Sequence, residues 1–282
     1  MDAASGQGPR WVANAAPTGR PALNLTQPWA HRELALYFAL RDVKARYKQA
    51  FLGVAWAGLQ PLAGAVVFTF VFNGLADISA PGRSYLSFAL VGFVVWSYAS
   101  TAMTNGANSL VQNADLLTKV AFPRIVGPAA SLLPPMIDLL IGCVLAAVVS
   151  TVVGDGVSVA GLLLALPLGL VLLMLTVAGP VLFFSASVVK YRDATVLLSF
   201  ALQLGLFASP VAYPPSLVAE RWRDAIYANP VTGVLGLFRA GLVDSPMPSA
   251  LQLGFSFAVA VVSMFMGLLY FRRNERELAD II

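Results

Sequence analysis

Six long apolar runs dominate this sequence. A transmembrane helix needs about 20 consecutive, mostly apolar residues, and such runs occur at 51–76, 85–105, 126–153, 157–187, 194–213 and 251–271. Only 11% of the residues are charged, whereas soluble domains have about a quarter. The sequence therefore predicts an all-α integral membrane protein with six transmembrane helices. A further apolar run at 231–242 is too short to cross and contains Arg239, so we expect an outer re-entrant segment between spans five and six.

The apolar runs divide the chain into four parts. Residues 1–28 are rich in Ala, Gly and Pro and lack the apolar core of a signal peptide, so we expect a disordered cytoplasmic tail that is not cleaved. An amphipathic interfacial helix is predicted at 29–50, followed by the six-span domain at 51–271. The remaining residues, 272–282, are expected to form a cytoplasmic C-terminal tail.

Basic residues predict the orientation, because cytoplasmic loops retain Lys and Arg. With the N-terminus inside, fourteen of the 18 basic residues lie on the cytoplasmic side, including all four lysines. The outer side keeps four arginines, which are Arg83, Arg221, Arg223 and Arg239. Both termini are therefore expected in the cytoplasm.

The predicted interfacial helix is basic and directly precedes the first span. Its apolar residues recur every three or four positions, which places them on one helical face; they are Leu36, Leu40, Val43, Tyr47 and Phe51. Basic residues lie beside this face at Arg41, Lys44, Arg46 and Lys48. Each gains about 1 kcal/mol near anionic lipid, so a membrane-surface anchor is the simplest interpretation. The alternative is mechanical, because a helix joined to a span without a linker transmits its tilt to that span.

Residue counts and motifs exclude most enzyme chemistry. The chain contains one Cys, Cys143, and one His, His31, whereas zinc sites and disulfide frameworks need several such ligands. A Walker-type phosphate-binding loop needs Gly directly before Lys, and none of the four lysines follows a glycine. We therefore expect no catalytic residue, no metal site and no ATP site in this chain.

Asp138 lies inside the third predicted span, just after Pro134 and Pro135. An ionisable residue at membrane depth is a candidate functional residue. It has three possible roles: lining a transport path, bracing a neighbouring helix, or carrying a proton. We favour a hydrogen bond to a Ser, Tyr or Trp of another helix. The sequence offers no intramembrane base as its partner, which argues against proton coupling.

Four segments resemble one family of membrane proteins. The stretch RDVKARYKQAFLGVAWAGLQPL at 41–62 closely resembles the N-terminal signature of ABC-2-type permeases that export bacterial polysaccharides such as O-antigen, capsule and teichoic acid. NADLLTKVAFPRIVGPAAS at 113–131 and VKYRDATVLL at 189–198 resemble cytoplasmic loops of that family. NPVTGVLGLFRAGL at 229–242 resembles its outer re-entrant segment. The resemblance covers about residues 30–275.

The resemblance implies that two copies of the chain form a channel and that two separate ATPase subunits, which bind ATP and Mg, dock beneath it. The docking element is expected in the loop that begins at 113, with the 191–193 loop as a second contact. The candidate coupling residues are Asn113, Asp115, Leu116, Lys119, Pro123 and Arg124. Asn113 can cap a short helix there and Asp115 suits its N-terminal dipole. The alternative is a solvated turn between two spans.

Aromatic rings in the first two spans are candidates for the channel wall. In a sugar exporter, flat rings offer weakly specific contacts to pyranose faces, a role that the resemblance implies for channel aromatics. The candidates are Phe68, Phe72, Phe88, Trp96 and Tyr98, together with Asp138. Interfacial belts and lipid-facing packing are the alternative explanation.

These inferences converge on the permease subunit of an ATP-driven exporter of the bacterial inner membrane. Its expected cargo is a polysaccharide linked to polyprenyl diphosphate. The expected partners are a second copy, two ATPase subunits, the cargo and membrane lipid, with no nucleic acid. Alternatives are an ABC-2 exporter of a small lipid or drug, and a secondary transporter that works without ATP.

Overall fold

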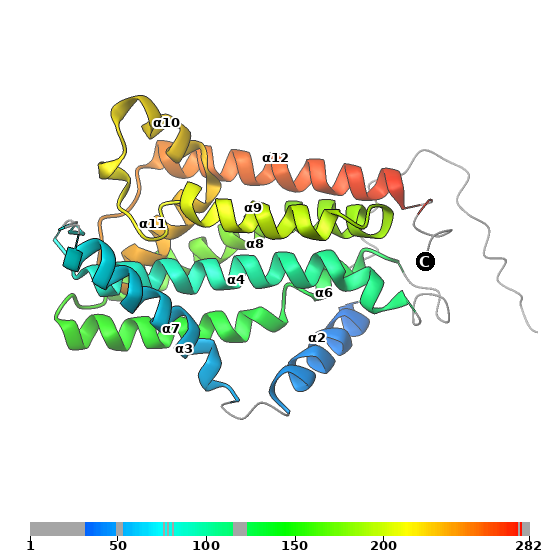
Figure 1. Ribbon diagram of the computed structural model, residues 1–282, viewed down its shortest axis with the longest axis horizontal. Helices are drawn as coiled ribbons and strands as arrows, with labels where there is room; N and C mark the ends of the chain where they lie inside the picture. Colours follow the sequence, from blue (N-terminus) through cyan, green and yellow to red (C-terminus); the bar gives the residue numbers. More distant parts are fainter. Residues whose placement is uncertain are drawn as a thin grey trace, which may run out of the picture.

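The computed structural model describes residues 32–48, 53–75, 77, 79–80, 82–114, 123–275 and 277. The predicted N-terminal tail therefore lies outside the described residues, as does most of the C-terminal tail. Twelve described helical elements follow one another (Figure 1). They are α2 (Arg32–Tyr47), α3 (Ala55–Phe68), η1 (Thr69–Leu75), α4 (Tyr85–Gln112), α6 (Val126–Ala130), α7 (Pro134–Val153), η2 (Gly161–Ala165), α8 (Leu166–Lys190), α9 (Ala194–Ala208), α10 (Glu220–Ala228), α11 (Pro230–Leu242) and α12 (Ala250–Asn274), with one 3-10 turn, η3 (Pro215–Leu217), before α10.

The all-helical prediction is confirmed for the described residues, but the number of long spans is smaller than expected. Five helical segments there are long and apolar enough to cross a membrane: Ala55–Leu75, Tyr85–Gln112, Val126–Val153, Gly161–Lys190 and Ala250–Asn274. The predicted fifth span, 194–213, contains only the 15-residue α9. Its helix ends because Ser209 precedes Pro210 and has an extended backbone. A residue before proline is disfavoured in a helix, and proline cannot donate the next backbone hydrogen bond.

The core of the bundle forms around α8, which packs against α4, α11 and α12. Small residues allow these helices to approach closely, as is typical of packing in membranes. A Cβ atom on Gly267 of α12 would overlap the carbonyl oxygen of Gly179 in α8. Glycine is therefore required where these two helices touch.

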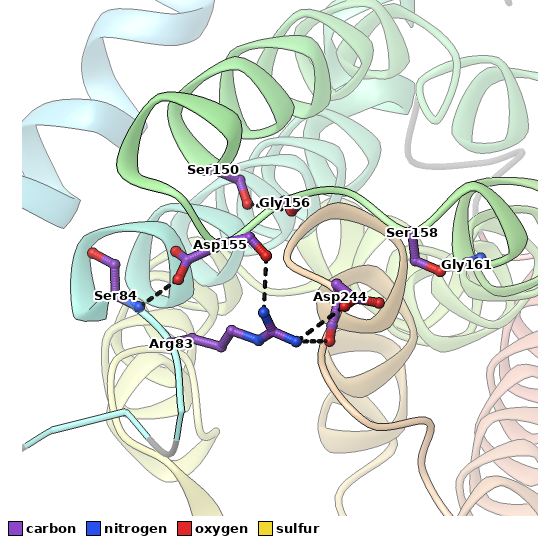
Figure 2. Close-up of polar contacts among 8 residues, drawn as sticks. All are labelled: Arg83, Ser84, Ser150, Asp155, Gly156, Ser158, Gly161 and Asp244. Atoms are coloured by element: carbon purple, nitrogen blue, oxygen red, sulfur yellow. Dashed lines mark hydrogen bonds and ion pairs between the residues drawn. The ribbon is translucent and has the colours of Figure 1, made fainter.

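Polar contacts mark two opposite ends of the bundle. At one end, Arg83 donates from Nη1 to the carbonyl oxygen of Asp155 at 2.8 Å and forms an ion pair with Asp244 at 3.1 Å (Figure 2). The backbone nitrogen of Ser84 donates to Oδ1 of Asp155 at 2.8 Å. These contacts tie together the segments that precede α4, follow α7 and follow α11.

The other end is held by contacts near the C-terminus of α12. Lys190 pairs with Glu277 at 2.6 Å, and Arg124 donates to the carbonyl oxygen of Glu275 at 3.4 Å. Lys190 therefore lies at this end of the bundle, and Asp244 lies at the opposite end. Between these two points α9 runs alongside α4 and α8 (Figure 1), so the chain changes ends although α9 is short.

Candidate functional site

The predicted coupling residues lie partly within the described structure. Asn113 directly follows α4: its backbone nitrogen donates to the carbonyl oxygen of Ser109 at 3.2 Å, which continues the helical pattern by one residue, and its side-chain nitrogen donates to the same oxygen at 2.7 Å. Pro123 and Arg124 lie just before α6. The other three candidates, Asp115, Leu116 and Lys119, lie outside the described residues, as does the short helix expected there.

Arg41 connects the interfacial helix to this loop. Its Nη2 atom donates to Oδ1 of Asn113 at 2.8 Å and to Oδ1 of Asp42 at 2.8 Å. The guanidinium also lies 5.3 Å from the centre of the Phe38 ring. α2 is therefore attached to the first residue of the predicted docking segment.

Phe38 is the main apolar contact of α2. It is 2% exposed and packs against Val126 and Ala130 of α6. The apolar face expected from the sequence differs from this one, because Leu36 and Leu40 are about half exposed. α2 thus has two apolar faces, one directed at the bundle and one that presents Leu36 and Leu40 outward. Phe51, expected on the outward face, lies outside the described residues.

The last turn of α2 is fixed to α7 by two consecutive side chains. Nη1 of Arg46 pairs with Oδ2 of Asp138, and the hydroxyl of Tyr47 donates to Oδ1 of the same carboxylate. Burial, followed by the neighbouring Asp138 carboxylate, raises the pKa of Tyr47 to about 12, so the hydroxyl remains a donor near neutral pH. We call this three-residue cluster the clasp.

The clasp changes the interpretation of Asp138. The expected hydrogen bond from a tyrosine of another helix is present. The sequence offers no intramembrane base as its partner, and the base that pairs with Asp138, Arg46, comes from the interfacial helix rather than from a span. A carboxylate whose two oxygens accept from a guanidinium and a hydroxyl has the partners that a buried charge requires. Lys44 and Lys48 on the same helix are exposed.

A cavity of about 230 Å³ lies between α2, the end of α4 and the junction of α6 with α7. Its wall contains Asp42 and Arg46 from α2, Asn105 and Gln112 from α4, and Pro134 at the start of α7. The cavity is thus bounded by the clasp on one side and by the Asn113 region on the other.

The aromatic candidates fall into two groups. Phe68, Phe72 and Trp96 are partly exposed; the Phe68 and Phe72 rings stack at 5.4 Å, and Trp96 lies against Gly205 of α9. Phe88 and Tyr98 are instead buried in the protomer, at 7% and 1% exposure. The Tyr98 hydroxyl lies 3.2 Å from the carbonyl oxygen of Leu132, between α6 and α7.

Arg239 is buried and joins three segments of the chain, a role that the sequence did not predict. It is 5% exposed, and its guanidinium lies 3.5 Å from the centre of the Phe88 ring. Nη2 donates to the carbonyl oxygens of Pro210 and Val211, at 2.9 and 2.7 Å. Arg239 therefore supplies donors to two carbonyl oxygens of the non-helical backbone that follows α9, as irregular backbone in a membrane protein requires. The available signal was a single basic residue inside an apolar run.

The long apolar helices, with polar contacts at the two ends of the bundle, define a multi-pass membrane protein. Residues 34–243 match the model of the ABC-2 type transporter family. The chain therefore belongs to this family of transporter membrane subunits, in which ATP binding lies in a separate ATPase subunit.

Curated relatives are similar along nearly the whole chain. The O-antigen export system permease protein RfbA of Myxococcus xanthus is 28% identical over 257 residues, which cover 90% of this chain and 97% of the relative. The protein of the same name from Klebsiella pneumoniae is 24% identical, with coverage of 89% and 95%. The polysialic acid transport protein KpsM of Escherichia coli is 22% identical, with coverage of 85% and 92%.

Proposed function

We propose that this chain is the permease subunit of an ATP-driven exporter that moves a polysaccharide linked to polyprenyl diphosphate across the bacterial inner membrane. The observation that carries the proposal is similarity to O-antigen export permeases over 90% of this chain and 97% of the Myxococcus relative. The working unit is two copies of the chain with two ATPase subunits.

In this proposal both termini face the cytoplasm and the chain crosses the membrane six times, with α9 as the short crossing. The support is geometric: Lys190 and Asp244 lie at opposite ends of the bundle, and α9 runs between them. The end that contains Arg41, Arg124 and Lys190 is the basic end, which the positive-inside rule assigns to the cytoplasm. α11 then forms the outer re-entrant segment.

The ATPase is proposed to dock at the 113–124 loop, with the 191–193 loop as a second contact. Arg41 holds Asn113 at the start of this loop, so a displacement of the loop is transmitted to α2. The partly exposed rings Phe68, Phe72 and Trp96 are the proposed contacts to the sugar chain, because Phe88 and Tyr98 are enclosed within the protomer.

Co-purification tests the assembly. The tagged permease, expressed with the genes that neighbour its own and extracted in a mild detergent, is expected to retain a soluble ATPase in a one-to-one ratio. Recovery of the folded permease without an ATPase would contradict the proposal. Cells in which this gene is deleted should retain the lipid-linked polysaccharide on the cytoplasmic face of the inner membrane.

Coupling is tested in the same complex by Arg124→Ala, Asp115→Ala and Lys119→Ala. Each is expected to lower export while ATP hydrolysis continues, since the permease no longer follows the ATPase. Arg221→Ala at the opposite end is the matched control and should leave both rates unchanged. Normal export in all three variants would remove the coupling role from the loop.

A further inference from the structure

The third apolar span is interrupted where α6 ends and α7 begins. Ser131, Leu132 and Leu133 lie between the two helices, and Pro134 and Pro135 occupy the first two positions of α7. Neither proline has a backbone N–H, so two donors of a continuous helix are missing at this point. The amide of Leu133 instead donates to Ala130, three residues back, at 3.1 Å. Breaks of this kind are where membrane helices bend.

α2 touches the span on both sides of this break and lies beside the junction in Figure 1. On the α6 side, Phe38 packs against Val126 and Ala130. On the α7 side, Arg46 and Tyr47 hold Asp138. The two attachments differ in kind: the first is apolar packing, and the second is an ion pair with a hydrogen bond.

The cavity described above lies directly at the break. Gly127, Ala130, Ser131 and Pro134 contribute to its wall, and the opposite wall belongs to α2. Packed interiors resist bending because they contain few voids. Space beneath α2 at the junction therefore gives α6 and α7 room to change their angle.

We propose that α2 bridges a hinge in the third span and restricts its bending, and that Asp138 is the positioning residue that keeps α7 attached to α2. With the clasp closed, α6 and α7 move as one body with α2. With the clasp open, α7 swings independently, while Phe38 and Arg41 keep α2 on α6 and on the end of α4. The use of this hinge in transport rests on the proposed function, whereas the hinge itself does not.

Spin-label distances in lipid nanodiscs test the hinge on the permease alone. Cys143→Ala removes the single cysteine of the chain. Labels are then introduced in pairs at exposed positions: Leu40→Cys with Val144→Cys reports on α2 against α7, and Leu40→Cys with Val111→Cys reports on α2 against α4. In the parent background each pair is expected to give a single narrow distance distribution.

Opening the clasp should affect only one of the two pairs. In Asp138→Ala, the 40–144 distribution is expected to broaden or split, while the 40–111 distribution stays narrow. Arg46→Met should act in the same way, and Lys44→Met is its matched control, because Lys44 lies on the same helix, is exposed and carries the same charge. The charge exchange Arg46→Glu with Asp138→Lys should restore the narrow 40–144 distance.

Two results would overturn the proposal. If neither distance changes in Asp138→Ala, the clasp does not hold α7. If both distributions broaden together, α2 has detached as a whole and no hinge separates α6 from α7. A functional measurement in the complex with its ATPase is independent of these distances: Asp138→Ala should reduce export while ATP hydrolysis continues, and absence of export activity in the parent protein would contradict the proposed function alone.

Discussion

Arg239 is held inside the bundle by carbonyl oxygens and an aromatic face, and no described carboxylate pairs with it. The carbonyls of Pro210 and Val211 lie just beyond the C-terminus of α9, the end at which a helix carries its partial negative charge. The Phe88 ring offers its negative face to the guanidinium. The carbonyl groups and the ring therefore stabilise the positive charge of Arg239, and its guanidinium in turn satisfies the irregular backbone that follows α9.

Replacement of Arg239 is expected to destabilise the fold more than replacement of any outer arginine. A buried acceptor left without a partner costs about 1–3 kcal/mol, and Arg239→Met leaves two, so the free energy of unfolding should fall by about 2–6 kcal/mol. The loss of stability in Arg239→Lys should be smaller than in Arg239→Met but still measurable, because an ammonium group can donate hydrogen bonds but lacks the planar set of donors of a guanidinium. Denaturant unfolding in detergent measures both, with exposed Arg221→Met as the control. Equal stability of Arg239→Met and Arg221→Met would contradict this role.

At the scale of single residues, the sequence identified important positions better than their partners. Asp138 is conspicuous because a carboxylate is costly at membrane depth. Its partners could not be deduced, since Tyr47 lies 91 residues away in a helix whose direction relative to the third span depends on tertiary packing. Phe88 and Tyr98 were assigned to the channel because aromatic identity alone does not distinguish a ring in the core from a ring on a wall.

At the scale of helices, hydropathy identified the five long spans and overestimated the helical length of the sixth apolar run. The run 194–213 is apolar throughout, so a count of apolar residues continues past Ser209-Pro210. The backbone does not, because the proline ends the helix at Ala208. The same chemistry divides the third span at Pro134-Pro135. Periodicity also does not reveal which apolar residues of α2 meet protein, since Leu36 and Leu40 lie outward while Phe38 packs against α6.

The contact between α8 and α12 gives a prediction at this scale. Gly267→Ala places a methyl group against the backbone of Gly179, and overpacking of this kind typically costs about 1–3 kcal/mol. Gly254→Ala lies on the same helix with nothing within 4 Å of the added carbon, so it should be neutral or slightly stabilising. The midpoints of thermal unfolding of the two variants compare them directly. A Gly267→Ala protein as stable as Gly254→Ala would show that the helices separate without loss.

For the whole molecule, polar contacts at the two ends of the bundle show where the chain changes ends, independently of helix length. Arg83 joins segments far apart in the sequence at one end (Figure 2), and Lys190 with Glu277 marks the other. The short α9 connects the two because Arg239 pairs the backbone that follows it. In the proposed topology α9 is a crossing with fewer than 20 helical residues, which is tolerated where protein encloses the irregular backbone.

This arrangement predicts opposite accessibility for two loops that flank α9 to α11. In the Cys143→Ala background, Met247→Cys and Tyr191→Cys each introduce one cysteine at a position that is about half exposed. A membrane-impermeant maleimide added to intact spheroplasts is expected to label position 247 and to leave position 191 unlabelled. After permeabilisation both should react, which controls for local burial. Labelling of both positions in intact cells, or of neither, would place the loops on the same side, and α9 would then not cross the membrane.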